Sequence, residues 1–117
     1  MSKTSVALIV KFVMTFVAAA IAFMILERNA LGWVALVALA GTILNYLLGD
    51  LVILPRFGNI VASLGDGVLA AVTAYVVDLI VPGFTTTWAA LAAFAVLVAV
   101  AEYFFHAYLR RSEKVAP

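Results

Sequence analysis

The 117 residues are 68% hydrophobic, and only 11% of them are charged. The mean hydropathy is +1.23. A water-soluble domain of this size needs far more charge on its surface than a chain embedded in lipid, so the composition indicates an integral membrane protein. The net charge of +1 excludes a nucleic-acid-binding face, and the absence of cysteine excludes disulfides, thiolate metal ligands and cysteine nucleophiles.

Four apolar segments lie at about residues 5–26, 31–54, 60–81 and 88–109. Each is close to the roughly 20 residues that a helix needs to cross the hydrocarbon of a bilayer. Polar residues 27–29, Pro55 with the following Gly58 and Asn59, and Pro82 with Gly83 separate the segments. We therefore predict a single all-α domain over residues 1–117, an integral membrane four-helix bundle with up-down-up-down topology.

The first segment also has features of a cleavable signal peptide. A basic start precedes an apolar run, and small residues at Ala18, Ala20 and Ala22 form a cleavage-like context. Lys11, however, interrupts the apolar run. We expect this segment to be retained as the first membrane span.

The distribution of lysine and arginine predicts the orientation of the chain. One side of the predicted bundle carries six of these residues, and the other side carries Arg28 alone. Basic residues favour the cytoplasmic side, so both termini and the turn at residues 55–59 are expected in the cytoplasm. The six residues are Lys3, Lys11, Arg56, Arg110, Arg111 and Lys114.

Each predicted span carries a stripe of small and polar residues with helical spacing. Small residues let membrane helices approach closely, and polar side chains avoid lipid by bonding across the interface, so we expect all four stripes to face inward. This pattern is also ordinary packing in helical membrane proteins. The stripes are Thr4, Ala7, Lys11, Thr15, Ala18 and Ala22; Thr42, Asn45, Tyr46, Gly49 and Asp50; Asn59, Ser63, Asp66, Ala70 and Thr73; and Trp88, Ala92, Ala95, Ala99, Glu102 and His106.

Ionisable residues from all four spans fall at similar depth, on the order of 5–12 Å from the cytoplasmic ends at about 1.5 Å per residue. Charges inside a bilayer are costly, so these groups should be paired, protonated or bound to a cation. The carboxylates outnumber the cations, so a carboxyl group that keeps its proton or a bound cation remains open. The candidate polar or ion cluster comprises Lys11, Asp50, Arg56, Asp66, Glu102 and His106. Asp50, Arg56 and Asp66 are expected to be linked beside the second turn, whereas Asp78 stands apart at the other end of the third span.

Glu102 and His106 are four residues apart and can point at the same place. This spacing permits a shared metal ion, a proton relay or a simple hydrogen bond. A zinc site normally has three or four protein ligands, so one such pair does not define a metal site. We assign no catalytic residues, no cofactor and no metal.

Three segments resemble the YndM-like family of small four-span membrane proteins, found mainly in Bacillus and related Gram-positive bacteria. They are Lys-Phe-Val-Met-Thr at residues 11–15, Gly-Asp-Leu-Val-Ile-Leu-Pro-Arg-Phe-Gly-Asn at residues 49–59, and Glu-Tyr-Phe-Phe-His at residues 102–106. Asp66 adds to the resemblance, which extends over nearly the whole chain. It implies the same topology and a multi-pass protein of the bacterial plasma membrane. It implies no activity, because the family is a domain of unknown function.

Two functions therefore remain. The first is a structural or accessory membrane protein with an inward-facing ionisable cluster; the alternative is a small oligomeric transporter or channel linked to protons or cations. No nucleophile and base stand out, so an enzyme is not expected. The expected partners are the lipid bilayer and either a second copy of the chain or an unidentified membrane protein, and no nucleic acid.

Overall fold

The computed structural model of the chain describes residues 2–112, with the side chains of residue 2 and residues 4–108. Over this range the protein is helical and has no β-strand. The elements are α1 (Lys3–Ala20), η1 (Ile21–Ile25), α2 (Leu31–Leu44), η2 (Asn45–Ile53), α3 (Leu54–Ile80) and α4 (Trp88–Ser112), of which η1 and η2 are π-helical. Lys114 lies outside the described residues, as do the side chains of Lys3, Arg110 and Arg111 that enter the orientation argument.

Three helical stretches are long and apolar enough to cross a membrane: Thr4–Ile25, Leu31–Ile80 and Trp88–Tyr108. The prediction of a helical membrane protein is confirmed to this extent. The second stretch contains 50 residues and includes both the second and the third predicted spans. The structure thus has three such stretches within the described residues, and the prediction of four separate spans is not confirmed.

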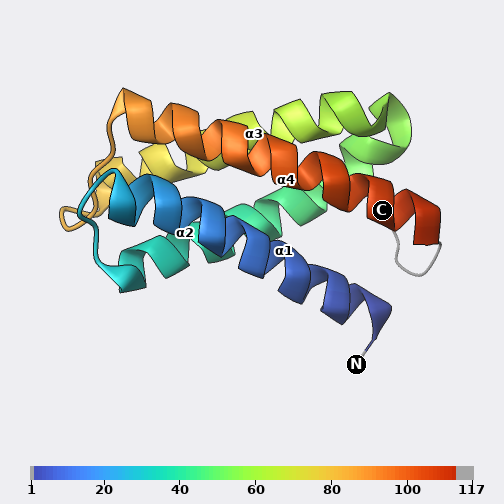
Figure 1. The fold of residues 1–117 in the computed structure, drawn as a ribbon, viewed down its shortest axis with the longest axis horizontal. Helices are drawn as coiled ribbons and strands as arrows, with labels where there is room; N and C mark the ends of the chain where they lie inside the picture. The colour runs from blue at the N-terminus through green and yellow to red at the C-terminus, as the bar shows by residue number, and fades with distance from the viewer. Residues whose placement is uncertain (1, 113–117) are drawn as a thin grey trace.

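The 50-residue stretch turns back on itself where η2 joins α3, the green segment of Figure 1. Gly58 is the only glycine with a positive φ in the described chain, with φ 85° and ψ 177°. A side chain would be strained in this conformation, and glycine is not. The predicted break thus falls at Gly58, whereas Pro55 occupies the first turn of α3, a position where proline is tolerated.

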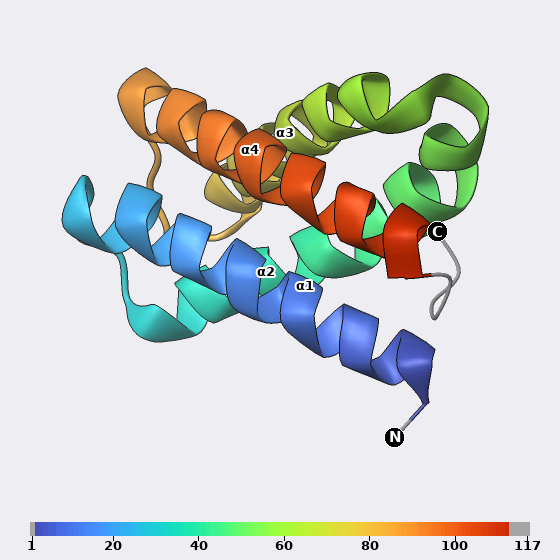
Figure 2. The ribbon, with the colours of Figure 1, turned by 45° about the vertical axis from the view of Figure 1, so that its right-hand side comes forward.

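The start of α1, the end of α4 and the turn between η2 and α3 lie at one end of the molecule, and the other two connections lie at the opposite end (Figures 1 and 2). Asn29 ties these two connections together. Its side-chain oxygen accepts a hydrogen bond from the Thr85 backbone N–H at 2.8 Å, and its Nδ2 donates to the carbonyl oxygens of Thr85 and Phe23 at 2.8 and 3.0 Å. Asp78 accepts two bonds from Thr86 nearby, so it anchors this end and stands apart from the other carboxylates, as predicted.

The helices enclose two apolar layers. The larger layer is centred on Phe23, whose ring meets Phe84 and Phe94 edge-on with centroids 5.3 and 5.0 Å apart. The smaller layer lies nearer the end that holds the turn, and it consists of Ala7, Leu54, Ala62 and Phe105. Lys11 falls between Ala7 of the smaller layer and Ala18 of the larger layer on α1. Lys11 therefore has apolar core residues on both sides of it along α1.

The inward stripe predicted for the fourth span is wrong in its outer half. Trp88 is 82% exposed and stacks on Tyr75, and Ala92 is also exposed. The buried face of α4 instead passes through Leu91, Phe94, Val98, Glu102 and Phe105. Large apolar side chains fill the core better than alanine, so in this outer half the buried face is shifted by about one residue relative to the predicted stripe. On the other three spans most stripe residues are buried.

Helices α3 and α4 approach each other closely at Gly67. A Cβ atom at this position would lie 2.5 Å from the Ala95 carbonyl oxygen and 3.1 Å from Ala99 Cβ. The two alanines of the predicted stripe therefore face α3, and the missing side chain of Gly67 allows the backbones to meet.

Candidate functional site

Five ionisable side chains converge between the two apolar layers, and we call them the ionisable cluster. Lys11 comes from α1, Asp50 from η2, Asp66 from α3, and Glu102 and His106 from α4. Each of the five is at most 1% exposed. The fold thus brings residues more than 90 positions apart in the sequence into one buried cluster. These residues were predicted to lie at a similar depth in the bundle.

Lys11 links three of the helical segments. Its ammonium nitrogen lies 3.1 Å from Asp50 Oδ2 and pairs with Glu102 Oε2. It also lies 5.1 Å from the centre of the Phe105 ring, where the face of the ring attracts a cation. A buried lysine in a membrane protein is costly unless its charge is paired. Two carboxylates and one aromatic face together offset that cost.

His106 links the two aspartates. Its Nε2 lies 2.8 Å from Asp50 Oδ1 and 3.1 Å from Asp66 Oδ2. Its other ring nitrogen, Nδ1, lies 2.9 Å from Asn59 Oδ1 and 3.3 Å from Ser63 Oγ. Both nitrogens of the ring are therefore engaged, and the orientation of the imidazole is fixed.

Asn59 and Ser63 belong to the site, although the sequence placed them only in a packing stripe and Asn59 at a turn. Ser63 Oγ donates to Asn59 Oδ1 at 2.9 Å, and Asn59 Nδ2 donates to the Tyr103 carbonyl oxygen at 2.8 Å. Their spacing from Asp66, seven and three residues, is the spacing of one helical face. That periodicity is the sequence signal that pointed to them.

The π-helical segment η2 gives Asp50 its place. Hydrogen bonds from i to i+5 bring residues five apart toward the same face, so Asn45 and Asp50 are both buried. Gly49 lies on the same side, and a Cβ atom there would come within 2.1 Å of Asp66 Oδ1. The absence of that side chain lets the Asp66 carboxylate lie against the η2 backbone, close to Asp50.

Arg56 does not belong to the cluster. Its side chain is exposed, and within the described residues it forms no ion pair with Asp50 or Asp66. The prediction that Arg56 links Asp50 and Asp66 is therefore wrong. An exposed guanidinium keeps its hydration, which it would lose on burial. Lys11 and His106 already contact the two aspartates from within the bundle.

The polar stripe continues from η2 into α2 beyond the cluster without bonds across the interface. Asn45 and Thr42 are buried, yet neither polar atom of the Asn45 side chain, nor Thr42 Oγ1, has a hydrogen-bond partner among the described residues. Thr73 on α3 bonds to the Leu69 carbonyl oxygen of its own helix. The expectation that polar seam residues bond across helices thus holds for the ionisable cluster and fails for these residues.

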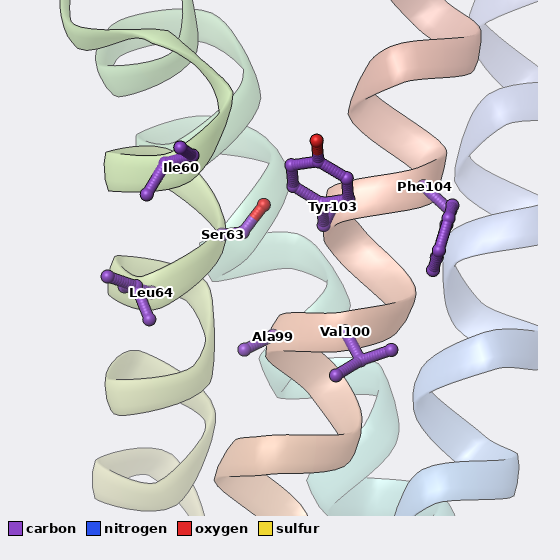
Figure 3. A pocket seen from close by; sticks show the side chains of 7 residues that line it. All are labelled: Ile60, Ser63, Leu64, Ala99, Val100, Tyr103 and Phe104. Atoms are coloured by element: carbon purple, nitrogen blue, oxygen red, sulfur yellow. The ribbon is translucent and has the colours of Figure 1, made fainter.

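A groove of about 280 Å³ runs along the outer side of α3 and α4. It is lined by the exposed Ile60 and Phe104, by Tyr103 and by Ser63, whose hydroxyl points toward α4 in Figure 3. Ser63 touches His106 Nδ1 on its inner side. Ser63 therefore lies between the apolar groove and the polar network around the imidazole.

Comparison with known proteins identifies the family. The uncharacterized membrane protein YndM of Bacillus subtilis (strain 168) is 42% identical to this chain over 81 residues, which are 68% of this chain and 45% of YndM. The chain thus spans less than half the length of this relative, and no solved structure matches it. The model of the family described as "Protein of unknown function (DUF2512)" matches residues 2–115, and the resemblance to YndM-like proteins is confirmed. The chain belongs to this family of membrane proteins of unknown function.

Proposed function

We propose that the protein is a structural or accessory component of a bacterial plasma membrane, built as a single four-span domain without enzymatic activity. One observation carries the proposal: the buried ionisable side chains pair with one another, and they come from α1, η2, α3 and α4. Buried polar contacts of this kind serve best to fix the register of helices. The network would hold the lipid-facing surfaces in one arrangement for a partner, either a second copy or another membrane protein.

The proposed topology has four spans with both termini in the cytoplasm. A straight helix of 50 residues would be roughly 75 Å long, whereas the longest extent of the molecule is 41 Å. The stretch from Leu31 to Ile80, bent at Gly58, is therefore best explained as two antiparallel spans. The six-to-one bias of lysine and arginine supports the orientation.

Single cysteines test this topology, because the chain has none of its own. We expect a cysteine at Thr85 to react with a membrane-impermeant thiol reagent in intact cells. Cysteines at Ser2, Arg56 and Ser112 should react only after the membrane is opened. Reaction at Ser112 but not at Thr85 in intact cells would reverse the orientation.

A proton- or cation-linked transporter is the second candidate, favoured by the surplus of negative charge in the cluster. Three carboxylates face one ammonium group, which leaves two formal negative charges when His106 is neutral. A mobile cation or proton would find a binding place there.

Flux through reconstituted protein separates the two functions. Liposomes that contain the purified protein and an internal pH-sensitive dye are given a membrane potential. If the protein is an accessory component, its proton flux should be no greater than in liposomes with the Asp66→Asn variant. External sodium or potassium should not change this result. A flux that the wild type shows and Asp66→Asn lacks would establish the transporter in its place.

A further inference from the structure

We propose that Asp50, Asp66, Glu102 and His106 bind one divalent transition-metal ion, of the kind that imidazole and carboxylate ligands hold. The inference goes beyond an accessory role and does not depend on it. Each of the four side chains offers one ligand atom, and these atoms all lie within 4.8 Å of one another. Zinc takes about four such nitrogen and oxygen ligands at roughly 2.0–2.2 Å. The pair that the sequence placed on one helix is thus completed by two aspartates from η2 and α3.

The hydrogen-bond partners of His106 determine which ring nitrogen carries hydrogen and which nitrogen can act as a metal ligand. Asn59 Nδ2 donates to the Tyr103 carbonyl oxygen, so the amide oxygen of Asn59 is the atom that faces His106 Nδ1. The Ser63 hydroxyl proton is also directed to that amide oxygen. Nδ1 must therefore carry hydrogen and donate it to Asn59. An N–H held by an outer carbonyl or amide oxygen is the usual arrangement behind a metal-bound histidine.

In its neutral form, His106 with hydrogen on Nδ1 presents the lone pair of Nε2 to two carboxylates. Nε2 lies 2.8 Å from Asp50 Oδ1 and 3.1 Å from Asp66 Oδ2. Three electron-rich atoms at such distances repel one another unless a positive charge lies among them. Ligands to one zinc ion lie roughly 3 Å apart, so small adjustments would admit the ion.

The remaining carboxylate supplies a free oxygen and completes the charge balance. Glu102 pairs with Lys11 through Oε2, while its Oε1 is buried without a hydrogen-bond partner among the described residues. With His106 neutral, Lys11 and the three carboxylates together carry a formal charge of −2. One divalent cation neutralises this charge. Buried charges that are not neutralised are costly in a membrane, so the ion should bind tightly.

Metal titration of the detergent-purified protein, stripped with a chelator, tests the site. We expect one Zn²⁺ bound per chain and a higher thermal midpoint on addition of Zn²⁺, with little effect of Mg²⁺, which prefers oxygen ligands and water. Co²⁺ should give the visible absorption of a site with a nitrogen ligand and few waters. Glu102→Gln and His106→Gln should each weaken Zn²⁺ binding by more than roughly 100-fold, and Asn59→Ala by roughly 10–100-fold, since it removes only the support of the imidazole.

Glu27→Gln makes the same chemical change in the connection between η1 and α2, and this variant should bind Zn²⁺ as the wild type does. Circular dichroism and size-exclusion chromatography of each variant establish that it is folded. Failure of the wild type to bind Zn²⁺ and Co²⁺ would overturn the proposal, and protons would then supply the positive charge at Nε2. Equal binding by the wild type and Glu102→Gln would overturn it too, because the metal would lie elsewhere on the protein.

Discussion

Lys11→Met is expected to destabilise the protein by about 3–5 kcal/mol, because it removes one partner from a buried ion-pair network. Methionine nearly matches the length of lysine and fits an apolar interior, so the loss of charge dominates over the change in shape. Lys11 contacts both Asp50 and Glu102, and neither carboxylate has access to water. Unfolding of the purified protein in mixed detergent, followed by circular dichroism, measures the effect.

Two further variants determine whether charge is the cause. Val10→Met introduces the same side chain at the adjacent position, where the exposed fraction is 41%, and it should leave the stability nearly unchanged. Lys11→Met combined with Glu102→Gln removes one charge of each sign and should regain about 1–3 kcal/mol relative to Lys11→Met alone. If Lys11→Met and Val10→Met were equally stable, the ion pairs would not hold the bundle together, and the register-fixing role would fail.

Gly67→Ala is expected to destabilise the protein by about 1–3 kcal/mol through overpacking between α3 and α4. The new Cβ would lie 2.5 Å from the Ala95 carbonyl oxygen, a backbone atom that cannot rotate away. The two helices would have to separate, and the separation would extend toward Glu102 and His106 on the same face of α4. The measurement is again the detergent unfolding free energy.

Gly65→Ala is the matched control, two residues away in the same helix. A Cβ at Gly65 meets only Ile53 Cδ1, at 3.9 Å, which is an ordinary contact. Alanine favours a helix over glycine by roughly 0.5–1 kcal/mol, so this variant should be as stable as the wild type or more stable. Equal destabilisation by both substitutions would contradict a specific close approach at Gly67.

Several features of the fold could be predicted because they depend on composition and on local chain properties. Apolar runs interrupted by charged or turn-forming residues define where helices can cross a membrane. The break near residues 55–59 followed from proline and glycine, and the backbone at Gly58 leaves the helical region there. The burial of Lys11, Asp50, Asp66, Glu102 and His106 followed from helical spacing and equal depth.

The errors arose where a prediction needed the rotation of a helix about its axis. Trp88 and Ala92 were expected to face inward, but the core selects Leu91, Phe94 and Val98 from the same helix. Arg56 was expected beside the aspartates because it is close to them in sequence, yet its side chain lies outside. Proximity along the chain does not give the direction of a long side chain that can remain in water.

The sequence by itself determined that this is a helical membrane protein and that its interior holds charges, since hydropathy and periodicity are local properties of the chain. Only the tertiary structure decided which charges meet. The π-helical segment η2 turns Asp50 toward His106, Gly49 admits the Asp66 carboxylate, and Asn59 and Ser63 orient the imidazole. These contacts depend on the relative rotation and separation of four helices. That geometry is set by packing between residues far apart in the sequence, and no local pattern specifies it.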